Sequence, residues 1–131
     1  MALADRHVAG LLAVRSDLAD FERLGQLEAH PLGLTHVQHH VLLSLGGHPH
    51  PTGPRIADVA RALGVASPSA VELVARMTTA GLLARLPDPA DRRATRLHLT
   101  ALGERLLHQL GENHLPRLRA LTARAVTLLV E

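Results

Sequence analysis

The sequence predicts a mainly α-helical α+β domain, in which a helix-turn-helix and a β-hairpin are flanked by a long helix at each end of the chain. Apolar residues recur at intervals of three and four along most of the chain, the spacing of one helix face. Two short helices in succession share a glycine-containing turn, which is typical of a helix-turn-helix. Two short alternating segments then enclose a proline-rich, charged turn, as the strands of a hairpin do.

The first two helices occupy the amino-terminal third of the chain. Helical spacing runs over about residues 4–29 and ends at Pro31, because the residue before proline avoids the α region. Thr35 is expected to cap a second helix that ends near Leu45 at a pair of glycines. The two prolines in residues 48–51 then predict a loop.

The helix-turn-helix follows this loop. Pro54 suits the first turn of its first helix, and Gly64 suits its end. Ser67 is expected to cap the second helix, with Pro68 at the first helical position, and that helix runs to about Ala80.

The hairpin and the last long helix complete the chain. The expected strands cover residues 82–86 and 95–99, around a turn at residues 87–93. Thr100 is expected to cap the final helix, which Pro116 should interrupt or restart.

Composition indicates one globular domain over residues 1–131 and excludes several chemistries. Hydrophobic residues make up 47% and charged residues 20% of the chain. The absence of cysteine excludes disulfides, thiolate catalysis and cysteine-ligated zinc. No apolar run is long enough to cross a bilayer, and the amino terminus lacks a signal-peptide core, so we expect a cytoplasmic protein without a membrane partner.

The basic residues are all arginine, and the net charge of +2 is too small by itself to indicate a nucleic-acid partner. The positions of the arginines therefore matter more than their number. Phe21 is the only aromatic residue apart from the histidines, which argues against a stacking platform for single-stranded bases.

The outer face of the second helix of the helix-turn-helix is a candidate DNA surface. Such a helix enters the major groove with its amino-terminal end first. The residues expected on this face are Ser67, Pro68, Ser69, Glu72 and Arg76. Serine hydroxyls suit phosphate or base contacts, Glu72 can accept from a cytosine amino group, and Arg76 suits phosphate. The alternative is an ordinary solvated helix face.

The turn of the hairpin is the second candidate surface. Arg92 and Arg93 lie at its tip, where an arginine can enter the narrow minor groove. Asp91 beside them is expected to hold a guanidinium through a bidentate ion pair. The alternative is a solvated turn with a local ion pair.

Several short motifs occur in order along residues 34–103. They are Leu34-Thr35-x-x-Gln38-x-x-Val41-Leu42, Asp58-Val59-Ala60, Gly64-Val65, Gly81-Leu82-Leu83-x-Arg85, Asp88-Pro89-x-Asp91-Arg92-Arg93 and Leu97-x-Leu99-Thr100-x-x-Gly103. Together they resemble the MarR family of bacterial winged-helix transcriptional regulators.

The resemblance implies a winged helix-turn-helix over residues 32–100 and a homodimer formed by helices in residues 1–31 and 101–131. It implies a regulator, commonly a repressor, that binds a pseudo-palindromic duplex operator and is released by a small-molecule effector between the lobes. Arg93 takes the minor-groove position, Asp91 braces it and Arg92 contacts phosphate nearby. The apolar stripes of the terminal helices independently favour a dimer, because a small winged helix cannot cover them.

The ten histidines raise a zinc-responsive alternative. Some zinc-sensing relatives take ligands at positions that correspond here to Glu22, His40 and His114. The fourth position falls on Leu110, so His36 or His108 would have to substitute. A second site of those relatives falls on Glu28, His39 and Gln109 and matches only in part. The alternative is that these histidines lie on helix surfaces or in an interface.

Two other classes of function were weighed. A dimeric adaptor of the same fold that does not bind DNA predicts a hairpin without arginine, which this chain contradicts. A metal-dependent hydrolase lacks an HExxH motif, suitably paired carboxylates and a glycine-rich phosphate loop, so we expect no enzyme.

Overall fold

The computed structural model describes residues 3–130 and confirms the mainly α-helical winged-helix fold. The elements in chain order are α1 (Asp5–Ala29), the 3-10 helix η1 (His30–Leu32), α2 (His36–Gly46), α3 (Ile56–Leu63), α4 (Ser67–Thr79), β1 (Leu83–Pro87), β2 (Thr95–Leu99) and α5 (Ala101–Leu129). Within residues 3–130, no helix is both long and apolar enough to cross a membrane.

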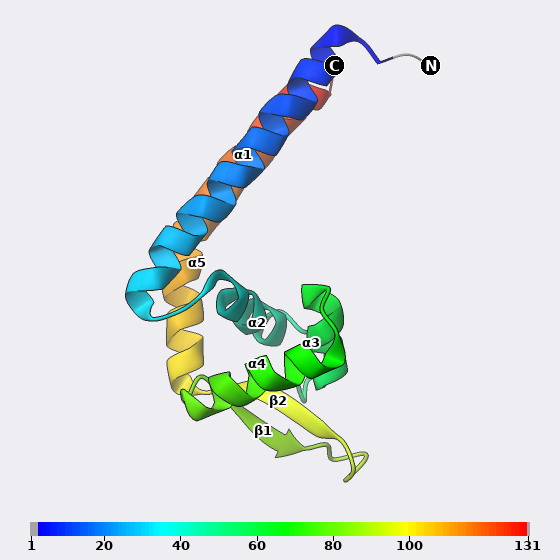
Figure 1. Ribbon diagram of the computed structural model, residues 1–131, viewed down its shortest axis with the longest axis vertical. Coiled ribbons are helices and arrows are strands. Elements are labelled where there is room, and N and C mark those ends of the chain that lie inside the picture. The colour runs from blue at the N-terminus through cyan, green and yellow to red at the C-terminus, as the bar shows by residue number, and fades with distance from the viewer. Residues whose placement is uncertain (1–2, 131) are drawn as a thin grey trace.

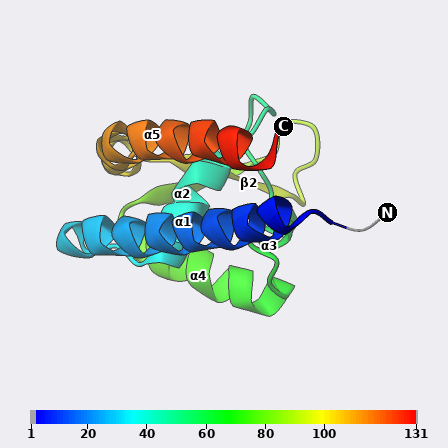
Figure 2. The ribbon, with the colours of Figure 1, turned by 90° about the horizontal axis from the view of Figure 1, so that it is seen from above.

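The molecule divides into a body and an arm (Figure 1). The body contains α2, α3, α4, the β-hairpin and the first half of α5. The arm consists of α1 and residues 112–129 of α5, which run side by side in opposite directions away from the body (Figures 1 and 2). A Cβ added at Gly10 would lie 2.8 Å from the carbonyl oxygen of Leu128, so the two helices of the arm approach closely there.

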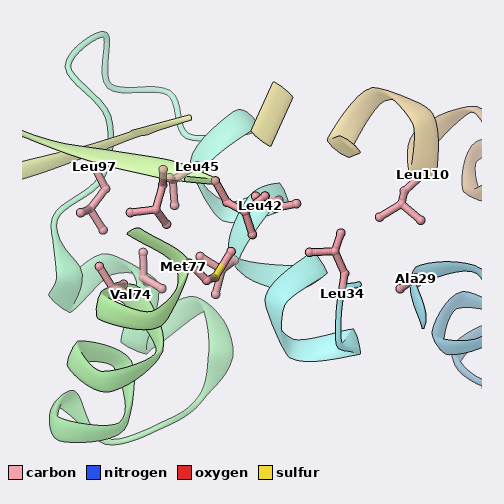
Figure 3. Packing of buried hydrophobic residues seen from close by; sticks show 12 residues of the cluster. Ala29, Leu34, Leu42, Leu45, Val74, Met77, Leu97 and Leu110 are labelled. Carbon is pink, nitrogen blue, oxygen red and sulfur yellow. The ribbon is translucent and has the colours of Figure 1, made fainter. Parts of the chain in front are cut away.

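The hydrophobic core fills the body and reaches the base of the arm. Leu97 of β2, Met77 of α4 and Leu42 of α2 are among the side chains that are fully buried. The cluster continues to Leu110 of α5 and Ala29 at the end of α1 (Figure 3). One continuous core therefore holds the hairpin, the helix-turn-helix and the arm together.

Local signals place most helix ends where the sequence predicts them. The Thr35 side chain accepts a hydrogen bond from the Gln38 backbone N–H at 3.1 Å, and the Gln38 side chain accepts from the Thr35 N–H at 3.0 Å. Gly64 ends α3 in the left-handed region with a φ of 68°. Thr100 caps α5 by accepting from the Gly103 N–H at 3.1 Å.

Two proline predictions in the helix-turn-helix are wrong by one or two residues. α3 begins at Ile56, and the carbonyl of Pro54 instead accepts a hydrogen bond from the Leu97 N–H of β2 at 2.9 Å. Ala66 has the extended N-cap conformation of α4, so Ser67 is the first helical residue and Pro68 the second. Proline is tolerated both just before a helix and in its first turn, because the backbone N–H at these positions has no partner within the helix.

Pro116 does not interrupt α5, which runs without a break from Ala101 to Leu129. Because proline has no backbone N–H, the carbonyl of Glu112 lacks its helical donor at this point. Such a gap bends a helix instead of ending it when packing on both sides holds the helix in place. Figure 1 shows α5 changing direction where it passes from the body into the arm.

Candidate nucleic-acid interface

The outer face of α4 carries all five residues that the sequence assigned to it. Ser67, Pro68, Ser69, Glu72 and Arg76 are exposed. The opposite face of the helix buries Ala70, Val74 and Met77 in the core, so packing fixes which residues point outward. No side chain caps the amino end of α4, where the Ser69 N–H donates to the Ala66 carbonyl at 3.1 Å, so the exposed side chains of Ser67 and Ser69 are what this end offers to a ligand.

Glu72 and Arg76 form an ion pair on this face. Their side chains are 66% and 70% exposed, and Nη2 of Arg76 lies 2.5 Å from Oε1 of Glu72. An exposed pair one helical turn apart is weak and exchanges easily for another partner. Either residue can therefore turn to a base or a phosphate at little cost.

The hairpin follows α4 and forms the wing, which we define as β1, the turn at residues 88–94, and β2. The strands pair antiparallel from Leu83 opposite Leu99 to Pro87 opposite Thr95. Arg92 and Arg93 lie exposed in the turn. Their side chains are free of any ion pair with a carboxylate in the described part of the chain, and so they project positive charge from the wing.

Asp91 holds the backbone of the turn and not a guanidinium. Its Oδ1 accepts a hydrogen bond from the Arg93 N–H at 3.0 Å. The sequence predicts a bidentate ion pair with an arginine at this position instead. A short carboxylate reaches the N–H two residues ahead more readily than a neighbouring guanidinium that points outward, which explains the difference.

Asp88 makes the ion pairs that were expected of Asp91. Its side chain is 3% exposed, and its Oδ2 accepts from Nη2 of Arg55 at 3.0 Å and from Nε of Arg96 at 2.9 Å. Its Oδ1 accepts from the Ala90 N–H at 2.9 Å. The Ala90 N–H, with the guanidinium groups of Arg55 and Arg96, lowers the pKa of Asp88 to about 2.

Sequence reasoning missed Asp88, Arg55 and Arg96 as part of this surface. Both Asp88 and Asp91 lie in the same charged turn, and only the three-dimensional register shows which one faces inward. Arg96 and Leu97 are neighbours on β2, so their side chains point to opposite faces of the hairpin. This alternation predicts the direction of the Arg96 side chain but not the residue that it contacts. The position of Asp88 directly before Pro89 at the end of β1 was the one available signal.

The body of the molecule is similar to a known protein family. A family model described as the MarR family matches residues 32–94, which span α2, the helix-turn-helix and most of the wing. Over this segment the chain is similar to the MarR family. No curated protein matches the chain.

Solved structures of MarR-type regulators have the same fold. The complex of MepR from S. aureus with DNA superposes with a TM-score of 0.72 at 20% identity, over 83% of this chain and 77% of that chain. Apo wild-type MarR from E. coli has a TM-score of 0.69 at 22% identity, over 85% and 81%. A transcriptional regulator from Thermotoga maritima has a TM-score of 0.68 at 28% identity, over 85% and 76%.

A cluster of titratable side chains lies where α1, α2 and α5 meet. The rings of His39 and His114 contact edge to face, with centroids 4.7 Å apart, and Phe21 packs against His114 at 5.4 Å. Glu28 accepts two hydrogen bonds from the guanidinium of Arg117, one of them at 2.6 Å. Burial lowers the pKa of His39 to about 4 and also lowers the pKa of His114.

This arrangement does not support the zinc-responsive alternative of the MarR family. Among residues 3–130, no three His, Cys, Asp or Glu residues lie close enough together to hold a metal ion. The candidates other than His114 lie exposed on the surface; they are Glu22, His36, His40 and His108. His39 and His114 approach each other, but their buried Nε2 atoms have no hydrogen-bond partner.

A cavity of about 710 Å³ opens beside this cluster at the base of the arm. Its walls come from α1, α2 and α5 and are mainly apolar, with Leu43, Leu107 and Leu118 among the lining residues. His108 and Arg119 supply polar groups at the lining. A cavity of this size can enclose a small organic molecule with an apolar body and an acidic group.

Proposed function

We propose that this protein is a homodimeric, sequence-specific regulator of transcription that binds duplex DNA and represses until a small molecule releases it. The observation that carries the proposal is the joint exposure of the amino-terminal half of α4 and of Arg92 and Arg93 on the wing. Figure 1 shows α4 and the wing on the side of the body that faces away from the arm. One duplex can therefore contact both.

The two elements suit different grooves. The first turn of α4 presents the exposed hydroxyl side chains of Ser67 and Ser69, which suit bases and phosphates of a major groove. Arginine on a thin hairpin suits the adjacent minor groove, where the negative potential is strongest. The DNA complex of MepR, which shares this fold, supports the assignment.

The arm supports a dimer. Large apolar side chains along it are exposed in the single chain; they are Val8, Leu11, Leu12, Leu18, Leu27, Leu115, Leu118, Val126 and Leu129. So many exposed apolar side chains on one extended element indicate an interface. A second copy would cover them and would place two α4 helices on half-sites about one DNA turn apart.

The cavity at the base of the arm supports release by an effector. It lies between the arm and the body, so a ligand there contacts both the dimerising helices and α2. A small apolar or phenolic acid fits its mainly apolar walls and the polar groups of His108 and Arg119.

Duplex binding as a function of salt tests the proposal. Duplexes that bind the purified chain are first selected from random DNA, and their affinity is then measured by fluorescence anisotropy at several salt concentrations. We expect an enriched palindrome and a logarithm of the affinity that falls linearly and steeply with the logarithm of the salt concentration. A non-DNA-binding adaptor would enrich no sequence and show no such slope.

A further inference from the structure

The buried carboxylate of Asp88 lies where three separate segments meet. Asp88 closes β1, Arg96 lies on β2, and Arg55 precedes α3. Asp88 and His39 are the buried polar or charged residues of the described chain. A buried carboxylate that contacts two guanidinium groups and a backbone N–H has a specific orientation, because each partner constrains one lone pair.

These contacts tie the wing to the residues before α3 at three points. Arg55 reaches Asp88 from the amino end of α3, and Nη1 of Arg96 donates to the Gly53 carbonyl at 3.0 Å. The Leu97 N–H donates to the Pro54 carbonyl at 2.9 Å. The direction of the wing relative to the helix-turn-helix therefore depends on this cluster.

We infer that Asp88 is a positioning residue for DNA binding: it orients the wing so that Arg93 reaches the minor groove while α4 occupies the major groove. This inference rests on the proposed function and adds a residue that makes no DNA contact itself. The turn residue Asp91 is exposed and holds only backbone, so it cannot link the wing to α3.

Replacing the carboxylate removes the link in two ways. The Asp88→Asn amide has one acceptor oxygen, so it cannot accept from both guanidinium groups and from Ala90 as the carboxylate does. Arg55 and Arg96 are then left as neighbouring like charges without a counter-ion. The wing tilts away from its orientation, although α4 keeps its packing on the core.

A double-mutant cycle on the selected operator tests the inference. We expect Asp88→Asn to weaken binding at least tenfold, and Arg93→Ala in the Asp88→Asn chain to weaken it little further, because the arginine no longer reaches its groove. Glu104→Gln, which removes the same charge from an exposed site in the first turn of α5, outside the arm, should bind as the unchanged chain does. The inference would be overturned if the fold-losses of affinity from Asp88→Asn and Arg93→Ala multiply in the double variant. Full operator affinity in Asp88→Asn alone would also overturn it.

Footprinting and amide exchange separate positioning from loss of folding. Asp88→Asn should lose minor-groove protection from hydroxyl radicals while α4 keeps protecting major-groove guanines from methylation. The wing amides, including that of Ala94, should exchange faster while amides in the core stay protected. Loss of both protections in a folded chain contradicts the inference.

A second variant covers the case in which Asp88→Asn does not fold. Arg96→Lys keeps the charge but replaces the two separate donor nitrogens that reach Asp88 and Gly53 with a single ammonium, so it should show the same selective loss of minor-groove protection to a smaller degree. Unchanged protection in folded Arg96→Lys would contradict the inference. Failure of the unchanged chain to bind any duplex would instead overturn the proposed function.

Discussion

At the scale of single residues, the arginines of this chain fall into two groups by what they contact. Arg55, Arg96 and Arg117 are held by carboxylates and shape the fold. Arg92 and Arg93 are exposed in the wing turn, where none of the ion pairs described for residues 3–130 reaches them. The second group therefore has charge available for a partner.

Arg93→Ala should reduce affinity for the operator more than tenfold, because a minor-groove arginine interacts with a strongly negative potential. Fluorescence anisotropy measures the affinity, and sedimentation should show the same oligomeric state as in the unchanged chain. Arg23→Ala removes an equal charge from an exposed site on α1 and serves as the control. Equal losses in the two variants would contradict the assignment of the wing.

His39 should make the fold sensitive to mild acid. Its pKa falls to about 4 in the folded chain from an ordinary value of 6.5. Between these values the unfolded chain binds a proton that the folded chain does not, so the free energy of unfolding decreases as pH falls from about 6.5 towards 4. The loss from this side chain is roughly 2–3 kcal/mol over that range.

Denaturant unfolding at several pH values measures this loss. His39→Leu should flatten the curve between pH 6.5 and 4, because the side chain that takes up the proton on unfolding is gone. His30→Gln removes one histidine from an exposed site and is the matched comparison. If both variants keep the full acid sensitivity, the effect does not come from His39.

At the scale of elements, helix ends could be predicted where the signal is local. Thr35 and Thr100 cap helices through bonds to residues three positions ahead, and Gly64 ends a helix by its own backbone conformation. The predicted effects of Pro54 and Pro116 on their helices were wrong, because these effects depend on contacts with β2 and on the packing around α5. Such contacts join residues far apart in the sequence, and spacing alone does not show them.

The residues of the candidate site also include some that could be predicted from local signals and some that could not. The exposed face of α4 could be predicted, because helical periodicity assigns the buried face and so leaves the outer one. The wing tip could be predicted from its charge. Asp88 could not be distinguished from Asp91, since the choice depends on whether Arg55 and Arg96 approach from outside the turn.

Replacing each of two glycines of α5 by alanine should change the free energy of unfolding in opposite directions. A Cβ at Gly103 would overlap the backbone carbonyl of Leu82, where α5 begins against the end of α4, whereas a Cβ at Gly111 meets nothing within 4 Å. Gly103→Ala should lower the free energy of unfolding by about 1–3 kcal/mol through overpacking. Gly111→Ala should raise it by about 1 kcal/mol through helix propensity.

Denaturant unfolding of both variants checks this pair. Because the two changes are chemically identical and lie in one helix, the difference between them isolates the contact with Leu82. Equal effects of the same sign would mean that α5 begins farther from Leu82 than the structure places it.

At the scale of the whole molecule, the surface that we propose for dimerisation lies on the arm, and the surface that we propose for DNA binding lies on the body. Ion pairs between described residues join α1 to α5 along the arm: Arg124 pairs with Asp17 at 2.7 Å, and Arg117 pairs with Glu28. The apolar residues that remain exposed on these helices are not needed to hold the two helices of one chain together. They are therefore available to a second copy.

Leu12→Glu should weaken the dimer at least tenfold, because it adds a charge to an apolar surface that a second copy would bury; Leu12 is 70% exposed in the single chain. Sedimentation at several concentrations measures the change, and operator affinity should fall with it. Ala57→Glu adds the same charge to an exposed site on α3 and should leave the oligomeric state unchanged. A Leu12→Glu dimer of ordinary strength would exclude this side of the arm from the interface.

The bonds from residues 53–55 to the wing also limit where the DNA-binding module can be cut from the rest of the chain. The carbonyl groups of Gly53 and Pro54 accept hydrogen bonds from Arg96 and Leu97 of β2, although about thirty residues separate them from β1 along the chain. A fragment that starts at α4 would keep the hairpin sequence but lose this lateral support. Protein engineers who graft the module onto another scaffold should therefore keep residues 53–55, and α2 with them, because Leu42 of α2 is buried in the same core.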